Sequence, residues 1–236
     1  MIERLNMPSN HQAKAALYEV IARVAQAAAN PHRLELLDLL VQAPRTVEQL
    51  AAASALSIAN TSQHLQRLKR AGLVVSERRG ASIRYHIADP AVARLWIELR
   101  TVADQQLAEM DRALDAYRTH RHAFTQISAD QLHARMEGSD IIVLDVRPRL
   151  EYEAGHLPGA YSIPLDELPT RLDELPTDAL IVTYCRGPLC VYADQALELI
   201  TASGRQGARL EEGVAEWQLT GYPLAERDLT TNGNAR

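Results

Sequence analysis

The fold class of the second half of this chain follows from the sequence Leu180-Ile-Val-Thr-Tyr-Cys-Arg-Gly-Pro-Leu-Cys-Val-Tyr-Ala-Asp-Gln-Ala-Leu-Glu-Leu-Ile200. Its start is apolar and β-branched and predicts a buried strand, whereas residues 191–200 have helical spacing. The loop between them holds the only two cysteines in 236 residues, Cys185 and Cys190. A strand, a short loop and a helix in this order are typical of an α/β layer.

The position of this loop also favours a reactive cysteine. A cysteine between a strand and a helix lies where backbone N–H groups converge and the helix dipole is positive. This environment lowers the pKa of a thiol from about 8.5 towards neutrality or below, and the thiolate is the nucleophile. We therefore predict that Cys185 is a nucleophile.

The neighbouring segments support a layered α/β domain. Residues 128–132 predict a capped helix, and residues 141–146 predict a second buried strand. Strands that alternate with helices predict a mostly parallel sheet.

The first half of the chain predicts helices followed by a hairpin. Helical spacing covers residues 12–29, about 34–40, 46–53 and 57–70, and stop signals follow these segments. Residues 73–87 alternate around a glycine turn and predict a β-hairpin with a basic tip. A long helix is expected from Asp89-Pro90 to about Tyr117. The polar junction after it divides the chain into predicted domains 1–120 and 121–236.

Charge differs between the two halves. Residues 1–120 carry 15 Lys/Arg against 12 Asp/Glu, or +3, and residues 121–236 carry 10 against 18, or −8. Six basic residues and only Glu77 lie between residues 61 and 84. A basic cluster in an acidic protein indicates a polyanion site, although a solvated charged face explains the charge alone equally well.

Composition argues against membranes and disulfide scaffolds. No apolar run approaches the roughly 18 residues of a membrane span, and the first residues lack the apolar region of a secretory signal. Two cysteines with four residues between them do not make a disulfide framework. We expect a cytoplasmic protein in a reducing compartment.

The segments at 46–53 and 57–70 with the basic hairpin form a winged helix-turn-helix pattern. The second helix has a polar face that can hydrogen-bond to base edges and phosphates, and the hairpin arginines can grip phosphates or a minor groove. The predicted DNA contacts are Asn60, Ser62, Gln63, Gln66, Arg67, Lys69, Arg70, Arg78, Arg79 and Arg84.

Here the sequence resembles the ArsR-type winged-helix repressors. The similarity covers about residues 12–118 and is carried by Asn30-Pro-His-Arg-Leu-Glu-Leu-Leu, Val47-Glu-Gln-Leu and the segment 57–74. The resemblance implies a homodimer formed by the first and last helices that binds a two-fold DNA operator as a repressor. By position, Asn60, Ser62, Gln63 and Gln66 are the base contacts.

The chain departs from the metal-sensing members of that family. It has no cysteine before Cys185, and its last helix has no histidine before His120. Soft and imidazole ligands that select transition metals are therefore missing from both sensor positions. We expect no metal site, and we expect any sensor to lie in the second domain.

The second half resembles the rhodanese domain over about residues 125–228. The motifs are Leu144-Asp-Val-Arg147, Glu151-Tyr-Glu-Ala-Gly-His-Leu-Pro-Gly-Ala160, the Cys185 loop, and Glu212-Gly-Val-Ala-Glu-Trp217. The resemblance implies a sulfurtransferase module that needs no cofactor beyond a covalent persulfide on Cys185.

The remaining site residues are predicted around this thiol. The backbone of residues 186–190 is expected to hold the persulfide anion, and Arg186 to attract a small anionic donor such as thiosulfate or polysulfide. Asp145 is expected to have a structural role, with a supporting role for Arg147. The persulfide and anion loop comprises Cys185, Arg186, Gly187, Pro188, Leu189 and Cys190.

Loop length separates this chain from related phosphatases. Those enzymes place an arginine six residues after the cysteine, where it clamps an oxyanion in a bidentate manner, but Val191 occupies that position here. Cys190 departs from the usual sulfurtransferase loop. It is either a resolving thiol for a Cys185 persulfide or a small half-buried residue, and a bridge requires Cα atoms within about 7 Å.

The sequence as a whole favours a transcriptional repressor that senses or transfers sulfane sulfur. One alternative is a thiosulfate-type sulfurtransferase whose helical domain mainly dimerises it, and another is an interaction module with an inert Cys185.

Overall fold

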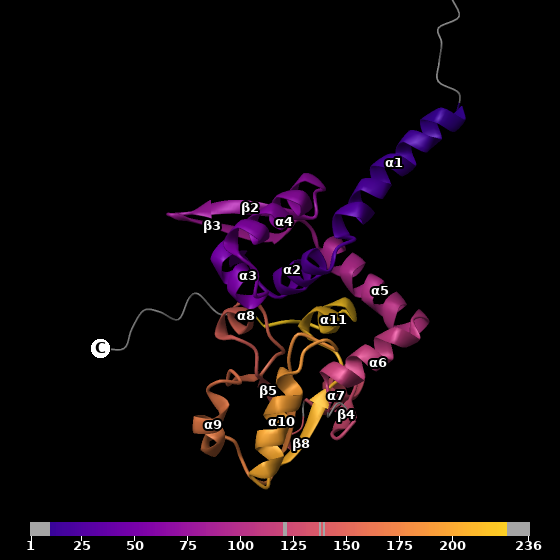
Figure 1. Ribbon diagram of the computed structural model, residues 1–236. Coiled ribbons are helices and arrows are strands. Elements are labelled where there is room, and N and C mark those ends of the chain that lie inside the picture. Colours follow the sequence, from indigo (N-terminus) through magenta and orange to yellow (C-terminus); the bar gives the residue numbers. More distant parts are fainter. Residues whose placement is uncertain (1–9, 120–121, 137, 139, 226–236) are drawn as a thin grey trace, which may run out of the picture. The chain divides into compact units, whose positions relative to one another are not determined.

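The computed structural model describes residues 10–119, 122–136, 138 and 140–225 (Figure 1). Two compact units form, one up to Trp96 and one from Ile97 onward. This boundary falls inside helix α5 (Pro90–Gln106), whereas the predicted boundary at 120 and 121 lies outside the described residues.

The first unit is a helical layer with a small sheet. The helices are α1 (Asn10–Ala28), α2 (Pro31–Gln42), α3 (Val47–Ala53) and α4 (Ile58–Arg70), followed by the start of α5. The strands are β1 (Arg45–Thr46), β2 (Val74–Arg79) and β3 (Ser82–Ile87), in the antiparallel order β1-β3-β2. The arrangement of α3, α4 and the β2–β3 hairpin confirms the predicted winged helix-turn-helix.

Side-chain caps set where the helices of this unit begin. The Thr46 side chain accepts a hydrogen bond from Gln49 N, and the Gln49 Oε1 atom accepts one from Thr46 N, which closes a capping box at α3. Ser57 caps α4 by accepting from Asn60 N. At the other end of α4, Gly72 has φ +74°, a left-handed conformation that glycine adopts without strain.

The core of the first unit lies between α2, α3 and α4. Leu36, Leu50, Leu65 and Leu68 are completely buried. Trp96 is buried at the edge of this unit, and its indole Nε1 donates to Asp38 Oδ1 at 2.9 Å. The buried indole N–H therefore has the partner that it needs.

The second unit is built on a five-stranded parallel sheet in the order β4-β8-β7-β5-β6. Its strands are β4 (Thr125–Ile127), β5 (Ile141–Asp145), β6 (Tyr161–Ser162), β7 (Leu180–Tyr184) and β8 (Gln206–Leu210). Its helices are the rest of α5, α6 (Ala108–Tyr117), α7 (Ala129–Arg135), α8 (Arg149–Ala154), α9 (Leu168–Arg171), the 3-10 turn η1 (Leu172–Glu174), α10 (Tyr192–Ala202) and α11 (Val214–Leu219). The predicted α/β fold with a parallel sheet is confirmed.

Both faces of this sheet are covered by helices. Successive side chains on each strand point to opposite faces, so neighbouring residues of one strand pack against different helices. On β7, Val182 packs with Trp217 of α11, whereas Ile181 packs with the buried residues of α10, which lies beside β8 in Figure 1. Cys185 and Cys190 belong to the cluster on the α10 face. The parallel arrangement puts the carboxyl ends of β5 and β7 at one edge, where the loop begins.

The long helix predicted from residue 89 to about 117 is interrupted at Leu107. This residue has φ −114° and ψ 103°, and α6 starts directly after it. Glu109 and Asp111 lie in the first turn of α6, where negative charge favours the start of a new helix. Among the described residues, no helix has both the length and the apolar character to cross a membrane.

The buried face of α4 gives a stability prediction. Leu65→Ala is expected to lower the free energy of unfolding by about 2–5 kcal/mol, because it removes a completely buried side chain and leaves a cavity. Ile58→Ala on the exposed face of the same helix is the control, with a change of about 0.5 kcal/mol or less. Urea unfolding followed by circular dichroism measures both, and equal losses would contradict the packing described.

Candidate functional site

The loop that follows β7 is buried at the edge of the parallel sheet. The Cys185 side chain is only 2% exposed, and Cys190 is also buried; both are free thiols. Gly187 has φ +122°, and a Cβ there would lie 3.2 Å from Glu216 Oε2. A side chain at Gly213 would collide with the backbone of Arg186. Two glycines are therefore required for the close approach of the loop and the start of α11.

The environment of Cys185 favours its thiolate. Burial opposes ionisation, but a hydrogen bond from Cys190, the charge of Arg209 and backbone hydrogen bonds from Ala193 and Gly187 lower the pKa of Cys185 to about 6. The same hydrogen bond, followed by burial, raises the pKa of Cys190. At neutral pH the loop thus holds a thiolate beside a protonated thiol.

Arg209, at the end of β8, is the cation whose charge lowers the pKa of Cys185. Its side chain is 2% exposed, and Nη2 lies 3.9 Å from Cys185 Sγ. Nη2 also donates to the carbonyl oxygens of Gly187 at 3.0 Å and Cys190 at 3.1 Å, and Nη1 donates to Asp194 Oδ1 at 2.9 Å. Arg209 therefore fixes the loop backbone and supplies positive charge to the sulfur.

Sequence reasoning missed Arg209 and Asp194. Arg209 belongs to none of the motifs that singled out the loop, and its contacts are with residues 15 or more positions away. The available signal was a single charged residue within the otherwise apolar end of a strand, Gly207-Ala-Arg-Leu210. A charge buried on a strand usually has a specific partner.

The structure places Arg186 in an ion pair at the rim of the loop. Its Nε lies 3.0 Å from both carboxylate oxygens of Glu151, and its Nη2 lies 2.7 Å from Oε1. The guanidinium also lies over the ring of Tyr192, 5.2 Å from its centroid. Glu151 is completely buried, so this pairing fixes Arg186 strongly. Its role in attracting a donor anion stays a prediction.

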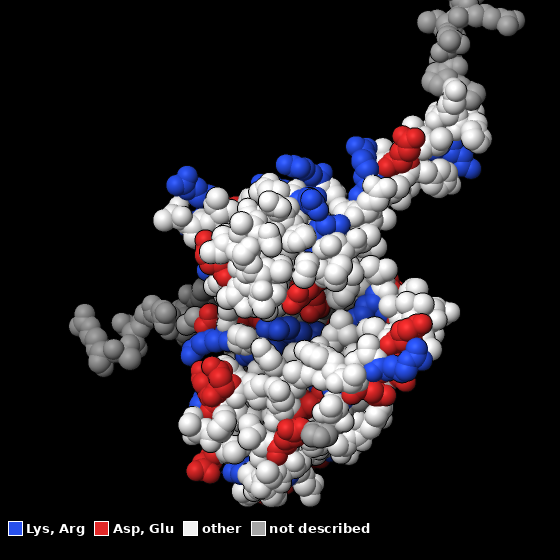
Figure 2. Space-filling view, in the orientation of Figure 1, with Lys and Arg blue, Asp and Glu red and all other residues white. Residues whose placement is uncertain are grey.

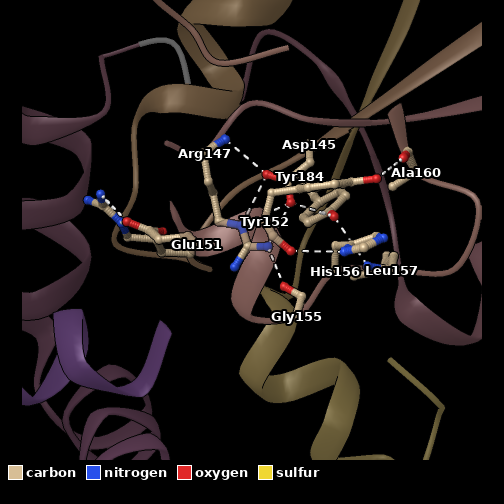
Figure 3. Close-up of polar contacts among 10 residues, drawn as sticks. Asp145, Arg147, Glu151, Tyr152, Gly155, His156, Leu157, Ala160 and Tyr184 are labelled. Carbon is tan, nitrogen blue, oxygen red and sulfur yellow. Dashed lines mark hydrogen bonds and ion pairs between the residues drawn. The ribbon is translucent and has the colours of Figure 1, made fainter. Parts of the chain in front are cut away.

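Asp145, the last residue of β5, and Arg147 form a second buried ion pair (Figure 3). Arg147 Nη2 lies 2.6 Å from Asp145 Oδ2 and donates to the Gly155 carbonyl at 2.8 Å. The Tyr184 hydroxyl donates to the same carboxylate at 2.7 Å and accepts from Leu157 N at 3.2 Å. Because Tyr184 immediately precedes Cys185, this network holds the end of β7 in place.

The predicted DNA contacts lie on α4 and on the β2–β3 hairpin. Figure 2 shows Lys and Arg side chains gathered along this edge of the first unit. Gln63, Gln66, Arg67 and Arg70 are exposed and line a shallow groove with the half-buried Ser62. Asn60 and Lys69 are also exposed on α4, as are Arg78 and Arg79 near the hairpin tip, and Arg84 is half-buried.

The polar face of α4 is distinct from its core face. Thr61, Leu65 and Leu68 on the opposite side are completely buried. At the tip of the wing, Gly80 has φ +61° and makes the tight turn between two exposed arginines and β3. The arrangement presents hydrogen-bonding and basic groups together, as direct base readout and phosphate contact require.

Among the described residues, α1 and α5 each carry several exposed apolar side chains. On α1, Leu17, Tyr18, Val20 and Ile21 are each more than half exposed. On α5, Leu95, Leu99 and Val102 are exposed as well. Contiguous apolar patches of this kind mark interaction surfaces.

Comparisons with known proteins agree with both halves of this description. Residues 30–76 match the model of the arsR family of bacterial regulatory proteins, and residues 128–220 match that of the rhodanese-like domain. The HTH-type transcriptional regulator Rv0324 of Mycobacterium tuberculosis is 42% identical over 93% of this chain and 96% of its own length.

Other relatives match one half each. A sulfurtransferase of Allochromatium vinosum is 29% identical over 42% of this chain and 92% of its own length. The solution structure of a homodimeric winged helix-turn-helix DNA-binding domain from Mycobacterium bovis is 43% identical, covers 44% of this chain and 95% of its own, and has a TM-score of 0.41. The full-length similarity to the mycobacterial regulator is the decisive finding: the chain belongs to the arsR family of bacterial regulatory proteins and carries a rhodanese-like domain in its second half.

Proposed function

We propose that this protein is a DNA-binding repressor whose operator affinity depends on the sulfur state of Cys185. The observation that carries the proposal is the pair of buried cysteines. Cys185 has a pKa of about 6, and the neighbouring Cys190 has a raised pKa. A thiolate can take up sulfane sulfur, and a second thiol beside it can resolve the persulfide that forms.

The first chemical step loads sulfane sulfur. The Cys185 thiolate attacks the outer sulfur of a donor such as thiosulfate, the S–S bond of the donor breaks, and sulfite leaves with the electron pair. Cys185 then carries a persulfide anion. Arg209 and the backbone N–H groups that lower the pKa of Cys185 also stabilise this anion.

The second step makes Cys190 a resolving thiol. Its sulfur attacks the inner sulfur of the Cys185 persulfide, a Cys185–Cys190 disulfide forms, and the outer sulfur leaves as hydrosulfide with the proton of Cys190. In this step the outer sulfur is reduced and Cys190 is oxidised, while Cys185 was already oxidised when the persulfide formed, so no further oxidant is needed.

On DNA, α4 is the recognition helix and the hairpin is the wing. Gln63 and its neighbours on the polar face contact base edges, and the wing arginines contact phosphates. The exposed apolar residues of α1 and α5 form the interface of a homodimer. A two-fold dimer reads a two-fold operator, since the two recognition helices then occupy equivalent half-sites.

A second candidate function is catalysis: a sulfurtransferase whose helical half mainly dimerises it. The lowered pKa of Cys185 favours this function too, as does the similarity to the sulfurtransferase of Allochromatium vinosum. Rapid thiosulfate:cyanide turnover without sequence-selective DNA binding would establish it. An inert Cys185 in an interaction module is the third alternative, and the alkylation profile below tests it.

Alkylation measures the predicted thiolate. The rate for Cys185 is expected to rise with pH and reach half its maximum near pH 6, the pKa of its thiol, because only the ionised form reacts. The rate becomes constant about two pH units above that midpoint, where nearly all of the thiol is ionised, and Cys190 stays slow because its pKa is raised. Rapid mixing with a bimane reagent and peptide mass spectrometry separate the two sites. A midpoint at the ordinary thiol value of about 8.5 would support the inert alternative.

An operator titration tests the regulatory proposal. DNA from the region upstream of the protein's own gene is titrated with reduced and with polysulfide-treated protein at one salt concentration. Treatment is expected to weaken binding by about 5- to 150-fold, the usual range of allosteric coupling, and Cys185→Ser is expected to abolish that response. Tight binding that treatment does not change would refute the proposal.

Base readout and phosphate contact are separable on the same helix. Gln63→Ala is expected to cost about 1–3 kcal/mol on the operator but little on unrelated DNA, because it removes a base contact. Arg70→Gln is the matched comparison. It is expected to weaken binding to all sequences alike and to lower the salt dependence by about one charge. Equal effects of the two variants on both DNAs would contradict the assignment of Gln63.

A further inference from the structure

The residue that follows α6 is bonded to the Cys185 loop. Arg118 is 7% exposed. Its Nε and Nη2 donate to the two oxygens of Asp194 at 2.7 and 3.1 Å, and its Nη1 donates to the Pro188 carbonyl at 2.9 Å. A bidentate Arg–carboxylate pair has a fixed geometry, so the end of α6 and the loop are held in one arrangement.

Asp194 connects Arg118 to the reactive sulfur. The carboxylate is 4% exposed and accepts from Arg209 as well as from Arg118. Arg209 in turn contacts Cys185 Sγ and two loop carbonyls. A continuous path of charge-assisted hydrogen bonds therefore runs from the end of α6 to the sulfur, through one shared carboxylate.

A second arginine of the same helical segment reaches the other side of the loop. Arg100 on α5 forms a buried ion pair with Glu216. Glu216 also accepts from Gly213 N at 2.9 Å, and its carboxylate fills the space beside Gly187 that a side chain would otherwise need. The segment 100–118 is thus bonded to the loop directly through Arg118, and Arg100 reaches it indirectly through Glu216.

The last residue of α6 also lies close to the thiols. Partial burial raises the pKa of Tyr117, and the negative charge that Cys190 can carry is the next largest cause. Added sulfur, or a Cys185–Cys190 bond, must be accommodated where Cys185 is almost completely buried. Because such packed regions change between discrete arrangements rather than deforming smoothly, the loop carbonyls must move, and the bonds of Arg118 and Arg209 with them.

We propose that Arg118 is a positioning residue of the Cys185 loop and that it transmits the sulfur state of Cys185, through Arg209 and Asp194, to α6. In the chain, α6 follows α5, which begins in the first unit, the one that carries the winged helix-turn-helix. A role of this coupling in DNA binding rests on the proposed function. Coupling is reciprocal, so Arg118 must also affect the reactivity of Cys185.

Amide hydrogen exchange of the DNA-free full-length protein tests the transmission. Exchange in residues 108–119 is compared before and after polysulfide loading of Cys185, with iodoacetamide as a second adduct on the same sulfur. In the wild type, modification is expected to change the exchange rate near the end of α6 by about fivefold or more, the lower end of allosteric coupling. Arg118→Lys keeps the charge but lacks the bidentate fork, and the change is expected to disappear.

The pH dependence of Cys185 alkylation provides a second test, because a purely structural role of Arg118 would leave it unchanged. In Arg118→Lys, Asp194 loses its bidentate partner and draws Arg209 away from the thiolate. The pH at which Cys185 alkylation reaches half its maximum rate is therefore expected to rise. A rise of one pKa unit from the wild-type value lowers the rate at pH 6 by about fivefold. Arg112→Lys is the matched control on α6, because this side chain is 71% exposed and its ion pair with Glu109 is 4.0 Å long.

Two results would overturn the inference: an exchange pattern of α6 that modification leaves unchanged in the wild type, or wild-type exchange and alkylation in Arg118→Lys. Arg118→Gln, which retains a donor for the Pro188 carbonyl, replaces the lysine variant if that variant unfolds. The operator titration measures DNA affinity, whereas hydrogen exchange and alkylation are measured on the protein without DNA. Failure of the coupling is therefore distinguishable from failure of the regulatory proposal.

Discussion

The buried carboxylate of Asp194 is the constraint on which the reactive loop depends. It accepts hydrogen bonds from Arg118 and Arg209, which come from opposite ends of the second unit's sequence. Loss of one partner of a buried ion pair typically costs about 3–5 kcal/mol, because a charge is left uncompensated. These arginines also hold the carbonyls of Gly187, Pro188 and Cys190, so the backbone conformation around the nucleophile follows from how this one charge is neutralised.

The parallel sheet determines which side chains lie near the Asp194 carboxylate. Adjacent parallel strands β5, β7 and β8 end at the same edge and deliver Asp145, Cys185 and Arg209 there. Asp145 is neutralised by Arg147, and Glu151 by Arg186 of the loop. Each buried acid therefore has its own arginine, and the positive charge of Arg209 remains close to the sulfur.

Local sequence patterns predicted the helices and strands, whereas contacts between residues distant in the sequence determined which side chains surround Cys185. The strand and helix around Cys185, the cap at Ser57 and the hairpin each depend on neighbouring residues, so the sequence was sufficient for them. The break at Leu107 was not foreseen, because apolar spacing continues across it. Arg118 and Arg209 could not be assigned to the site, since their partners lie 76 and 15 positions away from them in the sequence.

The attachment of Arg118 to Asp194 has an evolutionary consequence. A rhodanese-like module cut at residue 121 would leave behind an arginine on which its own reactive loop relies. Shuffling such a module between regulators would therefore require the preceding helix to travel with it, or a compensating substitution at position 194. The two halves of this chain are expected to have diversified together, as one inherited unit, rather than as interchangeable parts.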